Sequence, residues 1–331
     1  MASPSNAILV TGGAGYIGSH TCKALAAQGY LPVAFDNLST GHADFLKWGP
    51  SVQGDIVDFR ALSDTLRRFN ISAVIHFAAL ALVGDSMKRP EDYYRTNVTG
   101  TLNVLEAMRQ AGVKNLVFSS SCATYGAPDQ VPITEDTLQR PINPYGSSKL
   151  MCERIAFDFA RTHDLSVSLL RYFNASGADA DAEIGEDHGN ETHLIPRAIL
   201  SALGRIDDFE VFGNDYPTPD GTAVRDYIHV TDLATAHIAA LKALQGGANS
   251  EAFNVGSGEG HSVLDVLKAI EGASGRSFAA VKGPRRAGDP PELVADATKI
   301  KQHLGFTPQH SDLNNVITSA WKWHNKRHGN A

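Results

Sequence analysis

Short runs of apolar residues alternate with amphipathic stretches along the first half of the chain. The runs are rich in Val, Ile, Leu and Phe, as is typical of strands buried on both faces of a parallel sheet. The intervening stretches repeat their apolar residues at helical spacing. This alternation predicts an α/β fold with a doubly wound, parallel, Rossmann-type sheet. The expected strands are 7–10, 31–35, 52–55, 73–77, 116–119 and 167–171, and the expected helices end near 28, cover 58–69, run from 90 to about 112, and begin at 144.

The alternation stops after Asn174. Residues 175–192 are rich in Ala, Asp, Glu and Gly, which favours a loop, and short mixed elements follow it. We therefore expect two domains: residues 1–175 with the parallel sheet, and residues 176–331 as a smaller mixed α/β domain over it, from which segments near 224–256 could return to the first domain. In the second half we expect extended segments at 210–212, 224–230 and 253–255, and helices at 194–203, 232–244, 262–274, 297–304 and 312–327.

A glycine-rich loop, residues 11–18, lies between the first strand and the first helix. Gly12, Gly15 and Gly18 permit a tight turn and a close approach of the backbone to a pyrophosphate, and the helix N-terminus supplies N–H donors. The next strand ends at Asp36, whose carboxylate can accept hydrogen bonds from ribose hydroxyls and would repel a 2′-phosphate. A purely structural turn is the alternative, but the strand, loop, helix, strand and acid in succession favour NAD binding over NADP.

A second candidate lies where a helix begins after Asn143. Asn143 suits the N-cap and Pro144 the first helical position, so Tyr145 and Lys149 fall on one helix face. An ammonium near a phenol favours the phenolate, which makes the tyrosine a usable base. Ser121, at the end of a strand, could hydrogen-bond the reacting oxygen. An ordinary helix face and a strand cap are the alternatives; with a nicotinamide present, the set predicts oxidation of an alcohol to a ketone.

Composition narrows the functional class. The 331 residues carry a net charge of −7, which argues against a nucleic-acid partner. The longest apolar stretch is shorter than the roughly 20 residues of a membrane span, so we expect no membrane partner. Cys22, Cys122 and Cys152 form neither a disulfide framework nor a metal-binding spacing, and we expect no metal. The first residues lack the pattern of a signal peptide, and a cytoplasmic location is the simplest expectation.

Further short motifs follow the glycine-rich loop. They are residues 119–121 with Tyr125-Gly126, residues 144–146 with Lys149, and residues 170–174. Together with the loop they resemble the extended short-chain dehydrogenase/reductase family. Three more motifs, residues 212–218, 224–230 and 285–289, resemble the nucleotide-sugar 4-epimerases of that family. The resemblance runs from the loop to the last 20 or so residues.

The resemblance implies an activity, a cofactor and partners. In such enzymes NAD stays bound throughout the cycle, and the C4 hydroxyl of UDP-galactose is oxidised to a 4-keto sugar. The sugar then turns over and is reduced on its other face to UDP-glucose, in the service of galactose metabolism. Relatives form homodimers through the helices that start near Pro90 and Tyr145, so the resemblance also implies a homodimer.

The resemblance further implies the roles of individual residues. The catalytic residues would be Ser121, Tyr145 and Lys149. The NAD-binding residues would be Gly12, Gly15, Tyr16, Ile17, Gly18, Asp36, Asn37, Ser39, Asp55, Ile56, Phe77, Ala78, Ala79, Asn97, Tyr145, Lys149 and Phe173. The nucleotide-sugar-binding residues would be Ser121, Tyr145, Asn174, His193, Leu194, Val211, Phe212, Arg225, Arg286 and Asp289.

His193, one of these nucleotide-sugar positions, lies where a polar residue such as Asn is common. Two positions depart from the family pattern. Ala81 replaces a common lysine, which removes a cationic contact with the cofactor. Leu293 lies near the position whose size controls the entry of N-acetylated sugars, and leucine is neither clearly bulky nor clearly small. A 4-epimerase for UDP-pentoses or UDP-N-acetylhexosamines therefore stays open beside one for UDP-hexoses.

Two other classes are less favoured. A nucleotide-sugar 4,6-dehydratase usually has Asp-Glu just after the serine or threonine, and Cys122-Ala123 here cannot transfer those protons. A decarboxylase on the same fold is the neighbouring alternative. A non-catalytic NAD-binding sensor or scaffold would keep the glycine loop and Asp36, but would not need Ser121, Tyr145 and Lys149 together.

Overall fold

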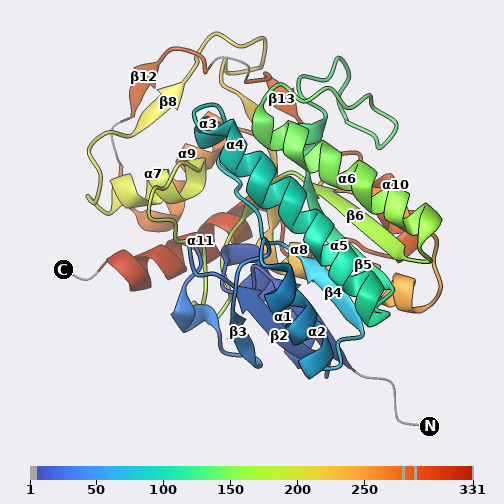
Figure 1. Ribbon diagram of the computed structural model, residues 1–331. Coiled ribbons are helices and arrows are strands. Elements are labelled where there is room, and N and C mark those ends of the chain that lie inside the picture. Colours follow the sequence, from blue (N-terminus) through green and yellow to red (C-terminus); the bar gives the residue numbers. More distant parts are fainter. Residues whose placement is uncertain (1–5, 278–279, 287–288, 330–331) are drawn as a thin grey trace.

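A seven-stranded parallel sheet forms the centre of the computed structural model, which describes residues 6–277, 280–286 and 289–329 (Figure 1). Its strands are β1 (Ala7–Thr11), β2 (Leu31–Asp36), β3 (Ser51–Gln53), β4 (Ala73–His76), β5 (Asn115–Ser121), β6 (Ser166–Tyr172) and β10 (Glu251–Val255). They lie in the order β10-β6-β5-β4-β1-β2-β3, and every neighbouring pair is parallel. The order reverses between β1 and β4, the place where such sheets bind ligands. The predicted doubly wound sheet is confirmed.

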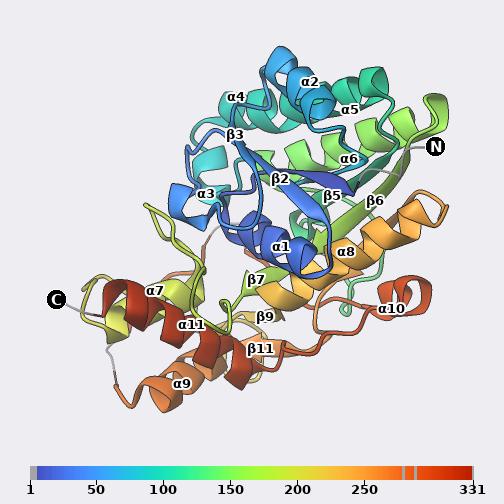
Figure 2. The same ribbon diagram turned by 90° about the horizontal axis from the view of Figure 1, so that it is seen from below.

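Helices cover both faces of this sheet, as Figure 2 shows. The residues of β1 demonstrate the effect: Leu9 packs in the core beneath one helical layer, whereas Ile8 and Val10 pack in the core of the other. Because both faces are covered, the strands are apolar throughout rather than alternating. One layer holds α2 (Phe59–Arg68), α5 (Gly100–Ala111) and α6 (Pro144–Thr162), and the other holds α1 (Tyr16–Ala27), α8 (Val230–Gln245) and α10 (Thr298–Leu304).

The expected helix starts have the local interactions that the sequence predicts. Asn143 caps α6 by accepting from Gly146 N at 2.8 Å, and Pro144 occupies the first turn. The helical run from Pro90 is continuous but not uniform: α4 (Pro90–Tyr93) passes through a π-helical segment (Tyr94–Thr99) into α5. In that segment the Asn97 carbonyl accepts a hydrogen bond from the Cys152 thiol of α6 at 3.2 Å. The π-segment therefore joins two helices of the same layer.

The second half of the chain builds a smaller α/β body, whose helices α7 (Leu194–Ala202), α9 (Val263–Ser274) and α11 (Leu313–His328) share one core. Strand β10 comes from this half of the sequence but pairs with β6 at the edge of the large sheet. The division at residue 175 stays a prediction. No described helix combines the length and the apolar character needed to cross a membrane. The remaining short elements are α3 (Val83–Ser86), β7 (Asn174–Ser176), β8 (Glu210–Phe212), β9 (Val224–His229), β11 (Gly260–Ser262), β12 (Val281–Gly283), β13 (Glu292–Leu293), and 3-10 turns at Ala43–Phe45 and Cys122–Thr124.

The buried imidazole of His237 on α8 makes the stability of the folded protein depend on pH. Its ring lies 4.6 Å from the ring of Phe77, and burial lowers its pKa to about 4. The unfolded chain, with a histidine pKa near 6.5, therefore binds more protons than the folded chain below pH 6.5, so stability present above that pH is lost as the pH falls. We expect His237→Met to reduce the loss of unfolding free energy between pH 6.5 and 5 by about 2 kcal/mol.

Urea unfolding at several pH values measures this effect. The control is His303→Met, because His303 lies at the surface beside Glu251. Equal pH dependence in His237→Met and the unmodified protein would contradict the prediction.

Candidate active site

A cavity of about 650 Å³ lies at the carboxyl ends of the central strands, between the large sheet and the smaller body. Its size suits a small-molecule or cofactor site. Two of the residues singled out from the sequence, Asn97 and Lys149, lie behind its wall, each almost fully buried. The others line it: Gly12, Gly15, Tyr16, Ile17, Gly18, Asp36, Asn37, Ser39, Asp55, Ile56, Phe77, Ala78, Ala79, Ser121, Tyr145, Phe173, Asn174, His193, Leu194, Val211, Phe212, Arg225, Arg286 and Asp289.

The glycine-rich loop forms one end of this cavity. Gly12 has φ +73°, and a Cβ there would lie 2.7 Å from Ala78 N; a Cβ at Gly18 would lie 2.0 Å from Gly12 O. Only glycine fits these two close approaches. Helix α1 follows with Gly15 as N-cap, no capping side chain and no acidic residue in its first turn. Its first N–H groups therefore face the cavity edge without a side-chain acceptor, an arrangement suited to a phosphate.

Asp36 shapes the next part of the wall. Its two carboxylate oxygens accept from Ala14 N at 3.0 Å and from Leu38 N at 2.8 Å, which ties the glycine loop to the end of β2. Asn37 donates to Asp55 at 2.9 Å and so connects the ends of β2 and β3. Each carboxylate oxygen of Asp36 keeps a further lone pair, so hydrogen bonds to ribose hydroxyls remain available.

Asn97 supports the wall rather than forming it. Its side-chain oxygen accepts from Leu80 N at 2.8 Å, and its amide nitrogen donates to Leu80 O at 3.0 Å and to Ser148 Oγ at 2.9 Å. The side chain therefore fixes the segment after β4, where Ala78 and Ala79 line the cavity, against helix α6.

Tyr145 and Ser121 come together from the first turn of α6 and the end of β5. The tyrosine side chain is 7% exposed and packs edge-on against Tyr93, with ring centroids 6.4 Å apart. Burial raises the pKa of Tyr145 well above its usual value and Tyr172 raises it further, while a hydrogen bond with Ser121 lowers it. The protein groups alone therefore hold this phenol in its neutral form.

That Lys149 lowers the pKa of Tyr145 stays a prediction, because the largest effects on this pKa come from burial and from other side chains. The Lys149 ammonium donates to Ser119 O at 2.8 Å, two residues before the serine that meets the phenol. Burial lowers the pKa of Lys149 to about 8, with Cys152 and Glu153 opposing this shift. The lysine thus stays mostly charged at neutral pH, buried one helical turn behind Tyr145.

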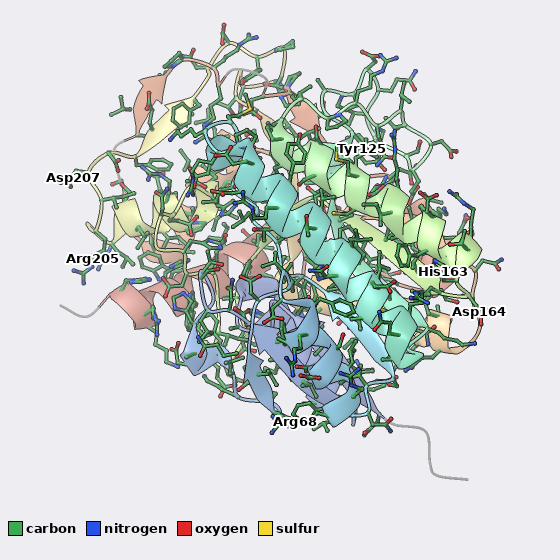
Figure 3. The ribbon with its side chains drawn as sticks, in the orientation of Figure 1. Arg68, Tyr125, His163, Asp164, Arg205 and Asp207 are labelled. Carbon is green, nitrogen blue, oxygen red and sulfur yellow. The ribbon has the colours of Figure 1, made fainter. Side chains whose placement is uncertain are left out.

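An ion pair that the sequence did not indicate lies directly behind these residues. Glu153 of α6 and Arg171 of β6 have side chains 2% and 7% exposed, and their closest contact is 2.7 Å. Ser120 of β5 donates to Glu153 at 2.5 Å, and Arg171 donates to the Tyr125 hydroxyl at 2.9 Å. Figure 3 labels Tyr125, which follows the turn after β5. The sequence did hold one indication of this ion pair. A carboxylate lies one helical turn after Lys149, on a face of α6 whose other residues are buried.

The opposite end of the cavity carries an aromatic ring and two arginines. The Arg286 guanidinium lies 4.1 Å from the centroid of the Phe212 ring. Arg225 is paired with Asp289 at 2.5 Å, so the residues predicted to contact separate parts of a nucleotide are held together. Leu293 lines the cavity beside them. This end can therefore offer a flat apolar surface and positive charge to one ligand.

Four titratable side chains, Glu186, His188, Glu191 and His193, converge in the loop before α7, and all but Glu191 line the cavity. His193 Nδ1 lies 2.8 Å from Glu186 and 3.0 Å from Glu191, and His188 Nδ1 lies 3.1 Å from Glu191. Burial lowers the pKa of His193, but the two carboxylates outweigh this and raise it to about 10. The sequence predicted a loop over 175–192 and a substrate contact at His193, but nothing in the spacing of 175–192 reveals which side chains converge.

Comparison with known proteins shows which family the chain belongs to. The model of the "NAD dependent epimerase/dehydratase family" matches residues 8–256, most of the chain. This chain belongs to that family. Members of the NAD dependent epimerase/dehydratase family that resemble it include a UDP-glucose 4-epimerase from Rhizobium meliloti (strain 1021), 52% identical over 98% of each chain. The predicted family and the predicted dependence on NAD are confirmed.

Solved structures agree over nearly the whole chain. One is a UDP-glucose 4-epimerase from Brucella ovis in complex with NAD, with a TM-score of 0.94 and 52% identity, covering 96% of this chain and 98% of that one. Another, from Stenotrophomonas maltophila with bound NAD and formylated UDP-arabinopyranose, has a TM-score of 0.94 and 42% identity, covering 97% and 98%. Family members with this architecture therefore bind NAD.

The Glu153–Arg171 pair generates a stability prediction. Glu153→Gln leaves the Arg171 charge buried without its partner, so we expect the free energy of unfolding to fall by about 3–5 kcal/mol. Denaturant unfolding measures the change. The control is Asp158→Asn on the same helix, which removes an exposed pair with Arg161 and should cost only a small fraction of that amount. Equal losses in the two variants would show that burial of the pair does not matter.

Proposed function

We propose that this protein interconverts UDP-galactose and UDP-glucose at C4 through a 4-keto intermediate, with tightly bound NAD. The observation that carries the proposal is the position of the Ser121–Tyr145 pair within one cavity. On one side of the pair lie the uncapped start of α1 and Asp36; on the other lie Phe212 and the arginines. A cofactor and a nucleotide sugar can therefore approach the same phenol from opposite ends.

The residues at the cofactor end fit NAD. Gly12 and Gly18 leave the space that a diphosphate needs, and the N–H groups of α1 supply its donors. Asp36 would hold the ribose hydroxyls and disfavour a 2′-phosphate. When bound, NAD supplies the acceptor and later the donor of one hydride. Ala81 lines the same wall and offers no charge, so retention of the cofactor rests on these backbone and carboxylate contacts.

Proton transfer falls to Tyr145. Its phenolic oxygen would take the proton from the C4 hydroxyl and return it after the sugar has turned, while Ser121 hydrogen-bonds the reacting oxygen. Because burial raises the pKa of Tyr145, the phenolate needs positive charge close by. Lys149 provides a buried ammonium one turn along α6, and the oxidised nicotinamide ring carries the same sign.

The two ends of the cavity suit a sugar that must turn while its nucleotide stays fixed. Phe212 and Arg286 form a stacked pair against which a uracil would lie, and Arg225 would face the diphosphate. Asp289 would accept from ribose hydroxyls, and Asn174, Leu194 and Val211 would complete the substrate side. The hexose would then lie at the Ser121–Tyr145 pair, where the 4-keto sugar has to turn.

A UDP-pentose 4-epimerase is the second candidate. It would need the same catalytic residues, and the similar structure from Stenotrophomonas maltophila holds a UDP-arabinopyranose derivative. UDP-N-acetylhexosamines remain a further alternative through Leu293, which lies on the cavity wall. Direct comparison of substrates separates these three possibilities.

The proposal includes a homodimer in the cytoplasm. Helices α5 and α6 lie side by side on one face of the molecule (Figure 1). Leu102 and Met151, on these two helices, have exposed fractions of 42% and 44%. Apolar side chains at that exposure on neighbouring helices suit a helical interface with a second copy. The free thiols of Cys22, Cys122 and Cys152 suit a reducing compartment.

Purified protein mixed with UDP-galactose, with no NAD added, tests the function directly. We expect NMR of the anomeric protons to show UDP-glucose growing to an equilibrium mixture, because the retained cofactor completes the cycle. Tyr145→Phe should lower the rate at least about 100-fold while NAD stays bound, since only the proton acceptor is lost.

Three outcomes would each contradict part of this proposal. Loss of NAD with retained turnover in Tyr145→Phe would make the tyrosine a cofactor ligand rather than the base. Faster conversion of UDP-arabinose than of UDP-galactose would show that the preferred substrate is a UDP-pentose rather than a UDP-hexose. Recovery of activity only with added NAD would show that Ala81 weakens retention of the cofactor.

The dimer has its own test. Leu102→Arg combined with Met151→Arg should convert the protein to a monomer, because four like charges would meet at the interface of two copies. Sedimentation mass measures the change. The control is Leu264→Arg, since Leu264 has the same exposure as Met151 but lies on α9. A single-chain mass for the unmodified protein would overturn the proposed dimer.

A further inference from the structure

We propose that Glu186, His188, Glu191 and His193 form a binding site for one divalent cation of the zinc type. All four come from one short loop and contribute one donor atom each. Those four atoms lie within 4.8 Å of one another. The site is separate from the Ser121–Tyr145 pair but opens into the same cavity.

The spacing of the donor atoms is close to that of a coordination shell. Zinc binds imidazole nitrogen and carboxylate oxygen at about 2.0–2.2 Å, so neighbouring ligands around a tetrahedral centre lie about 3.3–3.6 Å apart. The measured nitrogen–oxygen separations are 2.8 Å and 3.6 Å from Glu186 to His193 and His188. From Glu191 they are 3.0 Å between Oε1 and His193, and 3.1 Å between Oε2 and His188. Each nitrogen thus neighbours both carboxylates.

The loop holds its donors in place through other contacts. Glu191 Oε1 accepts from Thr192 N and His193 N, each at 2.8 Å, which leaves Oε2 directed to His188. Trp323 Nε1 donates to the Glu186 carbonyl at 3.2 Å and fixes the other end of the loop. Hydrogen bonds of this kind to metal ligands orient them and strengthen binding.

The mixture of donors selects the cation. Two imidazoles with two carboxylates favour zinc and similar transition metals, whereas magnesium and calcium prefer oxygen ligands alone. A nearby acidic group provides a contrast. Asp179, Asp181 and Glu183 also converge, but Lys23 lies within 2.8, 3.6 and 2.7 Å of them and already supplies the positive charge. Among the described residues, the printed ion pairs of Glu186 and Glu191 are all with the two histidines.

The position of the site suggests what the cation would contact. Glu186, His188 and His193 line the cavity, so one side of the coordination shell would face it. Expansion of the shell to a fifth ligand on that side could accept a diphosphate oxygen of the nucleotide sugar. This last step rests on the proposed function, whereas binding of the cation does not.

Metal binding by the full-length, untagged protein tests the site. After dialysis against a chelator, isothermal titration with Zn²⁺ should show one equivalent bound, and Co²⁺ should give a visible absorption band. His193→Gln and His188→Gln should each weaken Zn²⁺ binding at least about 100-fold, since loss of a ligand costs no less than loss of an outer contact. His303→Gln is the matched control, because His303 also pairs with a glutamate, at 2.9 Å, but outside the cluster.

The outcomes separate the proposal from its alternatives. Absence of stoichiometric Zn²⁺ binding, or equal affinity in the unmodified protein and both cluster variants, overturns it and leaves protonated histidines as the balancing charge. Circular dichroism and bound NAD report whether each variant folds, and one folded variant suffices. Addition of UDP to the Co²⁺ form should shift its absorption; an unchanged spectrum overturns the diphosphate contact while the cation site stands. Loss of epimerase activity alone decides neither point.

Discussion

The buried pair of Glu153 and Arg171 is the interaction on which the arrangement of the active site depends. Charges removed from water are tolerated only when they are matched in distance and hydrogen bonding. Here the match requires α6 and β6 to stay in one register, and Ser120 adds β5 to the same set. The helix that carries Tyr145 and Lys149 therefore cannot slide along the sheet without separating two buried charges.

A second constraint places everything else around that helix. All strands of the large sheet run in one direction, so the glycine loop, Asp36, Ser121 and the segment after β4 emerge at the same edge. The smaller body then needs only to cover that edge to enclose a cavity. Cofactor and substrate residues far apart in sequence meet there because strand direction, rather than loop design, brings them together.

The sequence predicted the features that depend on near neighbours. Strand and helix periodicity, the Asn143 cap and the glycine loop all follow from contacts within a few residues, and the structure confirms them as elements. The sequence did not predict which side chains far apart in the chain would contact one another. The direction of the Lys149 ammonium depends on the Ser119 carbonyl, and the pairing of Arg225 with Asp289 joins two separate motifs. The His–Glu cluster is local in sequence, yet only the folded loop turns its four side chains to one point.

The return of β10 to the sheet has a consequence for synthesis of the chain. Strand β6 ends at Tyr172 and its outer partner begins only at Glu251, so roughly 80 residues must be made between them. At about 5–20 residues per second the edge of β6 stays uncovered for several seconds or more on the ribosome. An exposed row of backbone donors and acceptors can pair with any passing strand. The chain's greatest exposure to misassembly therefore falls after helix α6 is complete and before its sheet is.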